Sequence, residues 1–411
     1  MKGKHLFTFY VVRVDRGPCV IIKQPYVLVL NVELYSHNGQ YWAEPLWHKD
    51  LLLHFSTIEY LTLACPVRDI PPPPSWIACD TSGLKIVPLP ALGRLSWLRI
   101  PEIAWIIHRA IRDAVIVHVG VAGWPFPLGW IATPLARRTQ KVIVIVIESS
   151  FWRVDEAKAS VFKILKSRIF EQLNIACIKK SDICFFTNEA YCQELGHGAP
   201  GTLHVLPASW LDERQLIEPK NISDKFKQIH EVRLLFAGRL TEAKGIVVLL
   251  SAIEMTSVMI DIIGEGDFGV RCREMADQLP HRVRVLDPVP YGDQFSALLD
   301  SYHAIVVPTL SDEQPRVLLD AFSRGLPAIA SDRSGNLDFV RPGETGWLVP
   351  AGDVTALANA MDTVASDAAG CEAMGLNARQ SIQFRTHEAM HRERAEKIQK
   401  VLLARGRVYT D

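Results

Sequence analysis

The chain has 411 residues, enough for two or more domains that each bury a core of their own. Lys and Arg together number 45, and so do Asp and Glu, so the formal net charge is zero. This balance removes the electrostatic basis for nucleic acid as a main partner. The 8 cysteines show no C-x-x-C pair and no metal-ligand spacing with histidine. We therefore expect reduced thiols in a cytoplasmic protein, with no disulfide framework and no metal site.

Two segments have to be distinguished from targeting or membrane sequences. Residues 1–24 are interrupted by Arg13, Asp15 and Arg16, so they do not fit a secretory signal. The uncharged stretch 114–136 is long enough to cross a membrane. Its glycines and prolines do not suit one continuous span. We interpret this stretch as a strand, a loop and a helix, with a transmembrane helix as the alternative.

Apolar strands and helices alternate along the first half of the chain. We expect strands at 26–32, 60–64, 84–87, 114–117, 142–147 and 183–186, and helices at 44–55, 101–112 and 155–173. A polar turn is expected at 36–39, and the four prolines at 71–74 must be extended. This alternation predicts an α/β layer built on a mostly parallel sheet.

The same alternation of strands and helices begins again after a polar segment, 212–231, which we interpret as an interdomain linker. Strands are expected at 232–237, 258–263, 283–286, 304–308 and 328–331. We predict an α/β fold with two doubly wound, Rossmann-like domains, 1–211 and 232–385, facing each other across a cleft. A charged, amphipathic C-terminal helix within 386–411 is expected to pack across the linker.

Four turns at strand ends of the second half carry glycines, cations or acids. They are GRLTEAKG at 238–245, GEG at 264–266, DEQPRVLLD at 312–320 and SGN at 334–336. The cations Arg239 and Lys244 lie on the first of them. Because the carboxyl ends of parallel strands meet at one sheet edge, these turns together predict a site for a nucleotide diphosphate.

The third turn predicts an anion site at the start of a helix. Pro315 suits the first helical position, and Gly325 suits the stop. The amides of Arg316 and Val317 would then lack partners within the helix and face an anion. The alternative is a surface ion pair between Arg316 and Asp320.

The order and spacing of these turns resemble the donor domain of the retaining glycosyltransferases of family 4, also called glycosyltransferase group 1, which have the GT-B fold. The resemblance is carried by GRLTEAKG, IIGEGD at 262–267, the run from 312 to 331 and RPGETGWLVP at 341–350. It covers about residues 231–366, and the first half only in layout. It implies metal-independent sugar transfer from a UDP-sugar or GDP-sugar to a glycan or lipid-linked acceptor, without a cofactor.

The resemblance also implies roles for individual residues. Arg239 and Lys244 would hold the diphosphate, Asp320 the ribose hydroxyls, and Asp312 would lie near the donor sugar. His118, at the end of a strand of the first half, would lie near the same sugar; a core histidine bonded to a backbone carbonyl is its alternative. The other donor-binding residues implied are Gly238, Gly264, Gly266, Glu313, Pro315, Arg316 and Val317. Asn38 and Gly39 are expected on the acceptor side.

The sequence departs from the family pattern within the third turn. Asp312 and Asp320 replace the two glutamates of the pattern E-x7-E, and Pro315 replaces a glycine. Glu313 could supply the longer carboxylate in place of Asp312. These departures keep open a catalytically silent relative that binds nucleotide or glycan as a partner subunit. A sugar-nucleotide epimerase on the same scaffold is a third hypothesis, which the cation pair Arg239 and Lys244 disfavours.

Basic residues cluster beside aromatic ones in the first half. The clusters are Arg94, Trp97 and Arg99, then Arg137, Arg138 and Lys141, then Lys158, Lys163, Lys166 and Arg168. Amphipathic stretches of this kind dock on anionic lipid. We expect peripheral contact with the inner face of a membrane, with a solvated basic face as the alternative.

Overall fold

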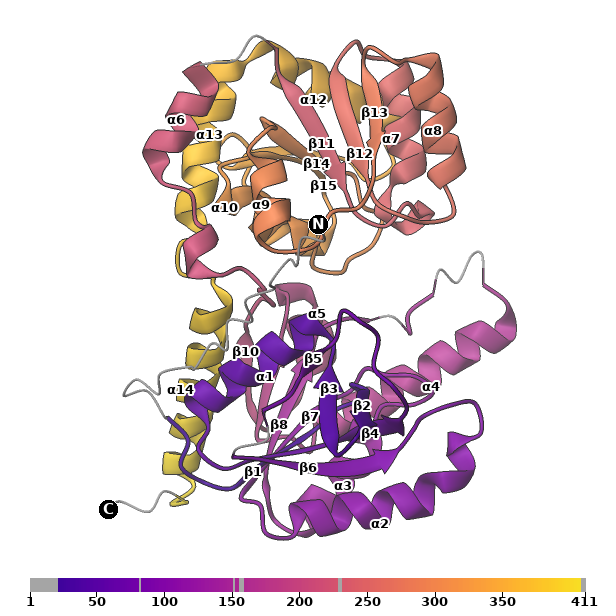
Figure 1. Ribbon diagram of the computed structural model, residues 1–411, viewed down its shortest axis with the longest axis vertical. Helices are drawn as coiled ribbons and strands as arrows, with labels where there is room; N and C mark the ends of the chain where they lie inside the picture. The colour runs from indigo at the N-terminus through magenta and orange to yellow at the C-terminus, as the bar shows by residue number, and fades with distance from the viewer. Residues whose placement is uncertain (1–20, 81–82, 151, 155–158, 228–230, 408–411) are drawn as a thin grey trace, which may run out of the picture.

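The computed structural model of the protein describes residues 21–80, 83–150, 152–154, 159–227 and 231–407. Two α/β units lie one above the other along the long axis of the molecule (Figure 1). The fold class predicted from the sequence is confirmed, because each unit is built on a wholly or mostly parallel sheet with helices on both faces.

The first sheet has ten strands in the order β10-β9-β8-β7-β1-β4-β2-β3-β5, with β6 paired to β4. All pairs are parallel except β2 with β3 and β3 with β5. Its strands are β1 (Tyr26–Val29), β2 (Leu34–His37), β3 (Gln40–Ala43), β4 (Leu61–Asp69), β5 (Ile77–Ala78), β6 (Leu84–Pro90), β7 (Ile116–Gly120), β8 (Val142–Ile147), β9 (Ile183–Phe186) and β10 (Thr202–Val205). The direction of strand order reverses between β1 and β7.

Helices bury apolar side chains against both faces of this sheet. One face is covered by α2 (Ile100–Ile111), α3 (Gly129–Arg138), α4 (Val161–Ile178) and α5 (Glu189–Gly196), with the short η1 (Ser96–Arg99) before α2. The other face is covered by α1 (Pro45–Thr57) and by α14 (His387–Ala404) from the end of the chain. Neighbouring residues of β7 show why, since Ile116 packs on one side and Val117 on the other.

The second sheet is entirely parallel, in the order β13-β12-β11-β14-β15-β16. Its strands are β11 (Arg233–Ala237), β12 (Met259–Ile263), β13 (Val283–Leu286), β14 (Ala304–Val307), β15 (Ala328–Ser331) and β16 (Gly346–Val349). Its helical elements are η3 (Glu242–Lys244), α7 (Ile246–Glu254), α8 (Gly269–Gln278), α9 (Asp293–Leu299), α10 (Val317–Ser323), α11 (Ser334–Leu337), α12 (Val354–Ser366) and α13 (Ala368–Ser381). This strand order is that of a Rossmann fold, with its switch point between β11 and β14.

Most predicted elements are present, with shifted ends. The strands predicted at 142–147, 183–186, 283–286 and 328–331 have the observed bounds. The strands β2, β3, β5, β10 and β16 were missed: β2, β3 and β10 have mixed polarity and lack a clear apolar period, whereas β5 and β16 are apolar but only 2 and 4 residues long. Asn38 and Gly39, with φ of 52° and 76°, form the two-residue turn of the β2–β3 hairpin.

Two further predictions concern helices. The stretch 114–136 contains β7, a loop and the start of α3, as predicted, and none of the helices in the described ranges is long and apolar enough to cross a membrane. The basic helix predicted from 155 begins later, at Val161 of α4. The prediction for residues 1–24 falls largely outside the described residues.

The segment predicted as a linker contains η2 (Glu213–Gln215) and α6 (Pro219–Lys227). Ile222 and Phe226 of α6 are buried in the core of the second unit. After the strands and helices of the second unit, the chain returns through α13 and α14. The last helix, α14, runs down along the first unit (Figure 1). The C-terminal helix thus contributes to the core of the first unit, while the domain boundaries themselves stay a prediction.

We predict that Gly245→Ala destabilises the second unit. Gly245 has a φ of +75°, and a Cβ there would lie 1.8 Å from the carbonyl oxygen of Pro308. We expect the free energy of unfolding to fall by at least about 2 kcal/mol, measured by denaturant titration. Gly238→Ala is the matched control, since the nearest atom to its Cβ would be 3.9 Å away. Equal losses in the two variants would contradict the prediction.

Candidate active site

The loops after β11 and β14 meet at the switch point of the second sheet, where open α/β sheets bind ligands. The carbonyl oxygen of Ala243 accepts hydrogen bonds from the Leu310 amide at 2.9 Å and from Thr309 Oγ1 at 3.0 Å. Gly245 allows the two loops to touch, backbone against backbone. They therefore form one continuous wall above the strand ends.

The predicted site glycines let a third loop join this wall. A Cβ on Gly264 would lie 1.8 Å from the carbonyl oxygen of Gly238, and one on Gly266 would lie 2.5 Å from that of Leu240. The amide of Gly238 donates to the carbonyl oxygen of Ile263 at 3.0 Å. Close packing of the loops accounts for these glycines, and direct contact with a ligand stays a prediction for them.

Three cations and one carboxylate gather at this wall. Lys244 Nζ lies 3.7 Å from Glu313 Oε2. Burial lowers the pKa of Lys244, Glu313 opposes that shift, and the nearby charges of Arg239 and Arg316 add to it. The side chain of Arg239 is exposed and makes no hydrogen bond or ion pair with any residue that the structure describes. The excess of positive charge favours the binding of an anion.

The structure distinguishes the two neighbouring acids of the third turn. Asp312 Oδ1 accepts hydrogen bonds from the amide of Ser334 at 3.3 Å and from its Oγ at 3.1 Å, so this carboxylate is directed toward α11. Glu313 is the acid beside Lys244. Glu313 is thus the acid that meets the cations, while the question that the sequence left open, which of the two acids faces the donor sugar, stays a prediction.

Asp320 is buried on α10, where its Oδ1 accepts a hydrogen bond from the hydroxyl of Tyr291 at 2.8 Å. Burial raises the pKa of Asp320 to about 6, while Tyr291 and the charges of Arg316 and Lys49 oppose the rise. Tyr291 belongs to the loop before α9, and no sequence pattern pointed to it. Both groups lie within electrostatic reach of Arg316, one of the three cations of the wall.

The helix of the third turn begins later than predicted. Pro315 is not its first residue, since α10 starts at Val317 and the carbonyl of Pro315 accepts the Leu318 amide at 3.0 Å in a preceding turn. Within the described part of the chain the amides of Arg316 and Val317 make no hydrogen bond, as predicted. The stop at Gly325 is confirmed, with a φ of +69°.

The alternative predicted for Arg316, an ion pair with Asp320, is wrong for the described structure. No salt bridge joins these two residues there; the guanidinium carbon of Arg316 lies 5.6 Å from the centroid of the Trp210 ring. Trp210 belongs to the segment that crosses between the two units. Arg316 therefore reaches from this wall toward Trp210 and the first unit.

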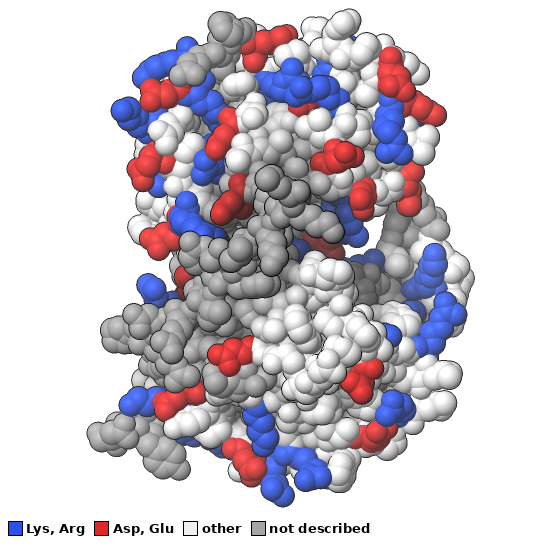
Figure 2. Space-filling view, viewed as in Figure 1, with Lys and Arg blue, Asp and Glu red and all other residues white. Residues whose placement is uncertain are grey.

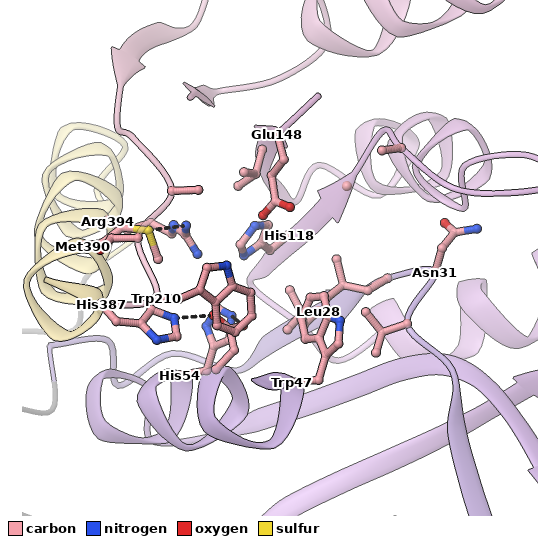
Figure 3. A pocket seen from close by; sticks show the side chains of 18 of the residues that line it. Leu28, Asn31, Trp47, His54, His118, Glu148, Trp210, His387, Met390 and Arg394 are labelled. Carbon is pink, nitrogen blue, oxygen red and sulfur yellow. Dashed lines mark hydrogen bonds and ion pairs between the residues drawn. The ribbon is translucent and has the colours of Figure 1, made fainter. Parts of the chain in front are cut away.

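A cavity of about 270 Å³ lies at the switch point of the first sheet (Figure 3). Residues from β1, β7, β8, α1, α14 and the crossing segment line it, among them Asn31, His118, Glu148, Trp210 and Arg394. Asn38 and Gly39 do not, since they are at the hairpin tip. The acceptor-side role expected for them therefore has no support in their position.

His118 projects from β7 into this cavity (Figure 3). Its Nδ1 is 2.7 Å from the hydroxyl of Tyr26, so its partner is a side chain and not the backbone carbonyl of the alternative. Burial, and then the charge of Arg394, lower the pKa of His118 well below the ordinary value. The imidazole is therefore neutral near pH 7 and can accept or donate one hydrogen bond at its other nitrogen.

Two charged residues of the cavity were missed. Glu148 directly follows β8, and its side chain is accessible to water inside the cavity. The protein walls around the cavity still remove part of its hydration, which raises the pKa of Glu148. Arg394 comes from α14, more than 200 positions away in sequence. An acid directly after an apolar strand was the available signal for Glu148, whereas only the fold places Arg394.

Polar contacts join the two units beside these sites. The side chain of Gln314 exchanges two hydrogen bonds of 2.9 Å with the backbone of Ala208. Asn188 Nδ2 donates to the carbonyl oxygen of Asp312 at 3.3 Å. The third turn is thus held against the first unit at Ala208, which lines the cavity.

Two doubly wound parallel sheets with their switch points turned to a shared cleft define the GT-B class of glycosyltransferase folds. The structural neighbours agree. Sucrose-phosphate synthase from Thermosynechococcus elongatus superposes with a TM-score of 0.66 at 18% identity, covering 93% of this chain and 100% of that one. Anabaena HepE in complex with UDP superposes with a TM-score of 0.65 at 14% identity, covering 92% and 100%.

Sequence comparisons support the same class. Residues 231–367 match the family model described as glycosyl transferases group 1, so this part of the chain is a domain of that kind. The amylovoran biosynthesis glycosyltransferase AmsK of Erwinia amylovora is 28% identical over 46% of this chain and 50% of its own length. The phosphatidyl-myo-inositol mannosyltransferase of Mycobacterium leprae is 36% identical over 31% and 36%. The matches thus span about half or less of these relatives.

The raised pKa of Asp320 makes a testable prediction about stability. The folded protein holds this proton up to about pH 6, above the ordinary value of 3.8, so ionised Asp320 costs stability as the pH rises through 6. Asp320→Asn should be more stable than the wild type at pH 8, by up to about 3 kcal/mol, and the advantage should shrink at pH 5.

Denaturant titrations of both proteins at the two pH values measure this difference. Asp277→Asn, on the exposed face of α8, is the control and should show no pH-dependent gap. A gap for Asp320→Asn that stays constant between pH 5 and pH 8 would rule out the proposed ionisation.

Proposed function

We propose that the protein is a retaining glycosyltransferase of family 4. It transfers a sugar from a UDP-sugar or GDP-sugar to a glycan or lipid-linked glycan acceptor. The observation that carries this proposal is the group of Arg239, Lys244 and Arg316 around Glu313, at the switch point of a glycosyl transferases group 1 domain. The named functions of AmsK and of the mannosyltransferase, and the UDP bound to HepE, support the same class of donor and acceptor.

The cations would act on the leaving group. Breaking the bond between the sugar and the diphosphate leaves negative charge on the β-phosphate, and Lys244 and Arg239 would stabilise that charge. We propose that the sugar departs and is attacked on the same face, so that the leaving phosphate takes the proton of the acceptor hydroxyl. This route needs no protein nucleophile and no metal ion at the diphosphate, because positioning and charge stabilisation lower the barrier.

The remaining residues of the wall would bind the donor. Glu313, beside Lys244, would face the sugar in place of Asp312, and the amides of Arg316 and Val317 would meet the phosphates. Asp320 would accept hydrogen bonds from the ribose hydroxyls, with Tyr291 fixing its carboxylate. On the other side of the cleft, His118 would contact the transferred sugar from the cavity wall.

We predict that Arg239→Ala and Lys244→Ala each lower kcat for sugar transfer by about 100-fold or more, because each removes a cation that meets charge developing in the transition state. Release of UDP or GDP, followed in the presence of acceptor extracts, measures turnover. Lys220→Ala, which changes an exposed lysine of α6, is the control and should leave turnover unchanged.

A thermal-shift panel of UDP, GDP and ADP tests the donor site separately. A ligand that binds the folded state raises the midpoint, and Lys244→Ala should reduce that rise. A nucleotide shift without turnover on any sugar donor would contradict the enzyme proposal and favour the silent relative, which nothing in the comparisons favours. Conversion of a UDP-sugar without acceptor would favour the epimerase. No shift with any nucleotide would overturn the site.

We also propose that α4 docks the protein on an anionic membrane. An apolar stripe of Val161, Phe162, Leu165, Ile169 and Leu173 is exposed along this helix, with Phe162 77% exposed. Spacing near four residues puts these side chains on one face. The helix also carries exposed Lys163, Lys166 and Arg168, and it projects from the first unit (Figure 1), where blue side chains stand on the outer edge in Figure 2.

We predict that Phe162→Glu with Leu165→Glu reduces sedimentation with vesicles of phosphatidylglycerol and phosphatidylcholine by about 10-fold or more, since burial of apolar area and attraction to anionic lipid both contribute. Phe384→Glu is the matched control, as this phenylalanine is 81% exposed on the second unit. Wild-type protein that does not sediment with anionic vesicles would leave the solvated basic face as the explanation.

A further inference from the structure

Two pairs of side chains face each other where α14 packs on α1. Asp50 and His54 are four residues apart on α1, and His387 and His391 are four residues apart on α14. Residues at this spacing share a helix face. All four are at most 8% exposed. Figure 3 shows His387 reaching from α14 toward α1.

Ligand atoms from three of these residues converge on one point. His387 Nε2 and His391 Nε2 each lie 2.9 Å from Asp50 Oδ1. One ligand atom from each of the three lies within 4.8 Å of the other two. His54 is adjacent, with its Nε2 at 3.4 Å from the other oxygen of Asp50. Among the described residues, His387 Nδ1 has no hydrogen-bond partner, so the ring is hydrogen-bonded through Nε2 alone.

We propose that Asp50, His387 and His391 bind a divalent transition-metal ion of the zinc type. Two imidazole nitrogens and one carboxylate oxygen are a ligand set that zinc takes with a fourth position left for water. Bonds of 2.0–2.1 Å put tetrahedral neighbours about 3.4 Å apart. The two observed separations of 2.9 Å would therefore need to widen by about 0.5 Å, which a side-chain adjustment supplies.

The fourth position of this ion would face the cavity. Asp50 and His387 line the cavity, whereas His391 lines a smaller, separate cavity between α1 and α14. The cation Arg394 and the carboxylate Glu148 line it too, so Glu148 and Asp50 together would offset the charge of the ion and of Arg394. A water molecule is the simplest occupant of the open position.

The sequence contains a signal for this site that was overlooked. Residues 387–391 read H-E-A-M-H, which has the spacing H-E-x-x-H of a helical zinc motif. The third ligand comes from α1, about 340 positions earlier, so only the fold completes the set. The ion would link the C-terminal helix to the first unit, apart from the diphosphate cations of the second, and the inference does not depend on the proposed function.

Metal content and binding of the full-length protein test this inference. Protein stripped with EDTA should bind one zinc ion per chain in calorimetry, and zinc should raise its thermal midpoint while magnesium does not. Asp50→Asn and His391→Gln should each weaken zinc binding by at least about 100-fold, since loss of a ligand exceeds loss of an outer-shell partner. His204→Gln, a half-buried histidine on β10, is the control.

Cobalt gives a readout that does not depend on stability. Stripped wild-type protein loaded with Co²⁺ should show the visible absorption bands of a tetrahedral nitrogen and oxygen site, and Asp50→Asn should lose them. Wild-type protein that takes up no zinc, or that binds zinc as tightly as both ligand variants, would overturn the proposal. The cluster would then be a hydrogen-bonded network that holds α14 to α1.

Discussion

The close approach of three loops at the switch point of the second sheet is the constraint on which the candidate site depends. Gly245 lies against Pro308, and Gly264 against Gly238, at distances that leave no room for a side chain. Because these backbones touch, residues of separate loops come within electrostatic reach of one another. Without the contact, Lys244 and Glu313 would stand on independent loops, and their ion pair would be lost.

Partial burial then determines how strongly the charges of this site interact. Lys244 is desolvated beside two other cations, and a single carboxylate, Glu313, opposes them. Fully exposed pairs of this kind contribute little, but the partly buried pair of Lys244 and Glu313 retains more of its interaction. A region with more positive than negative charge in such surroundings is stabilised by an anion, which is why a diphosphate is the ligand that suits it.

The two units have the same doubly wound architecture, and each contributes a different part of the candidate site. Each is a doubly wound sheet whose switch point faces the cleft, one with the cation wall and the other with the cavity around His118. The third turn contacts both, since Gln314 is bonded to the crossing segment and Arg316 lies over Trp210. α14 completes the first unit from the far end of the chain, so the cavity exists only when the C-terminal helix is in place.

The sequence alone determined the α/β class, most of the buried strands and the turns whose charged residues the structure brings together after β11 and β14. Apolar runs at regular spacing identify parallel strands, and glycines and cations directly after them identify the sheet edge. Local pattern could not decide that Glu313 and not Asp312 meets Lys244, because neighbouring side chains differ in direction only once the loop is folded. Nor could it bring Arg394 to His118, or Asp50 to His387 and His391. Those contacts join positions hundreds of residues apart, and only the packing of α14 on the first sheet places them together.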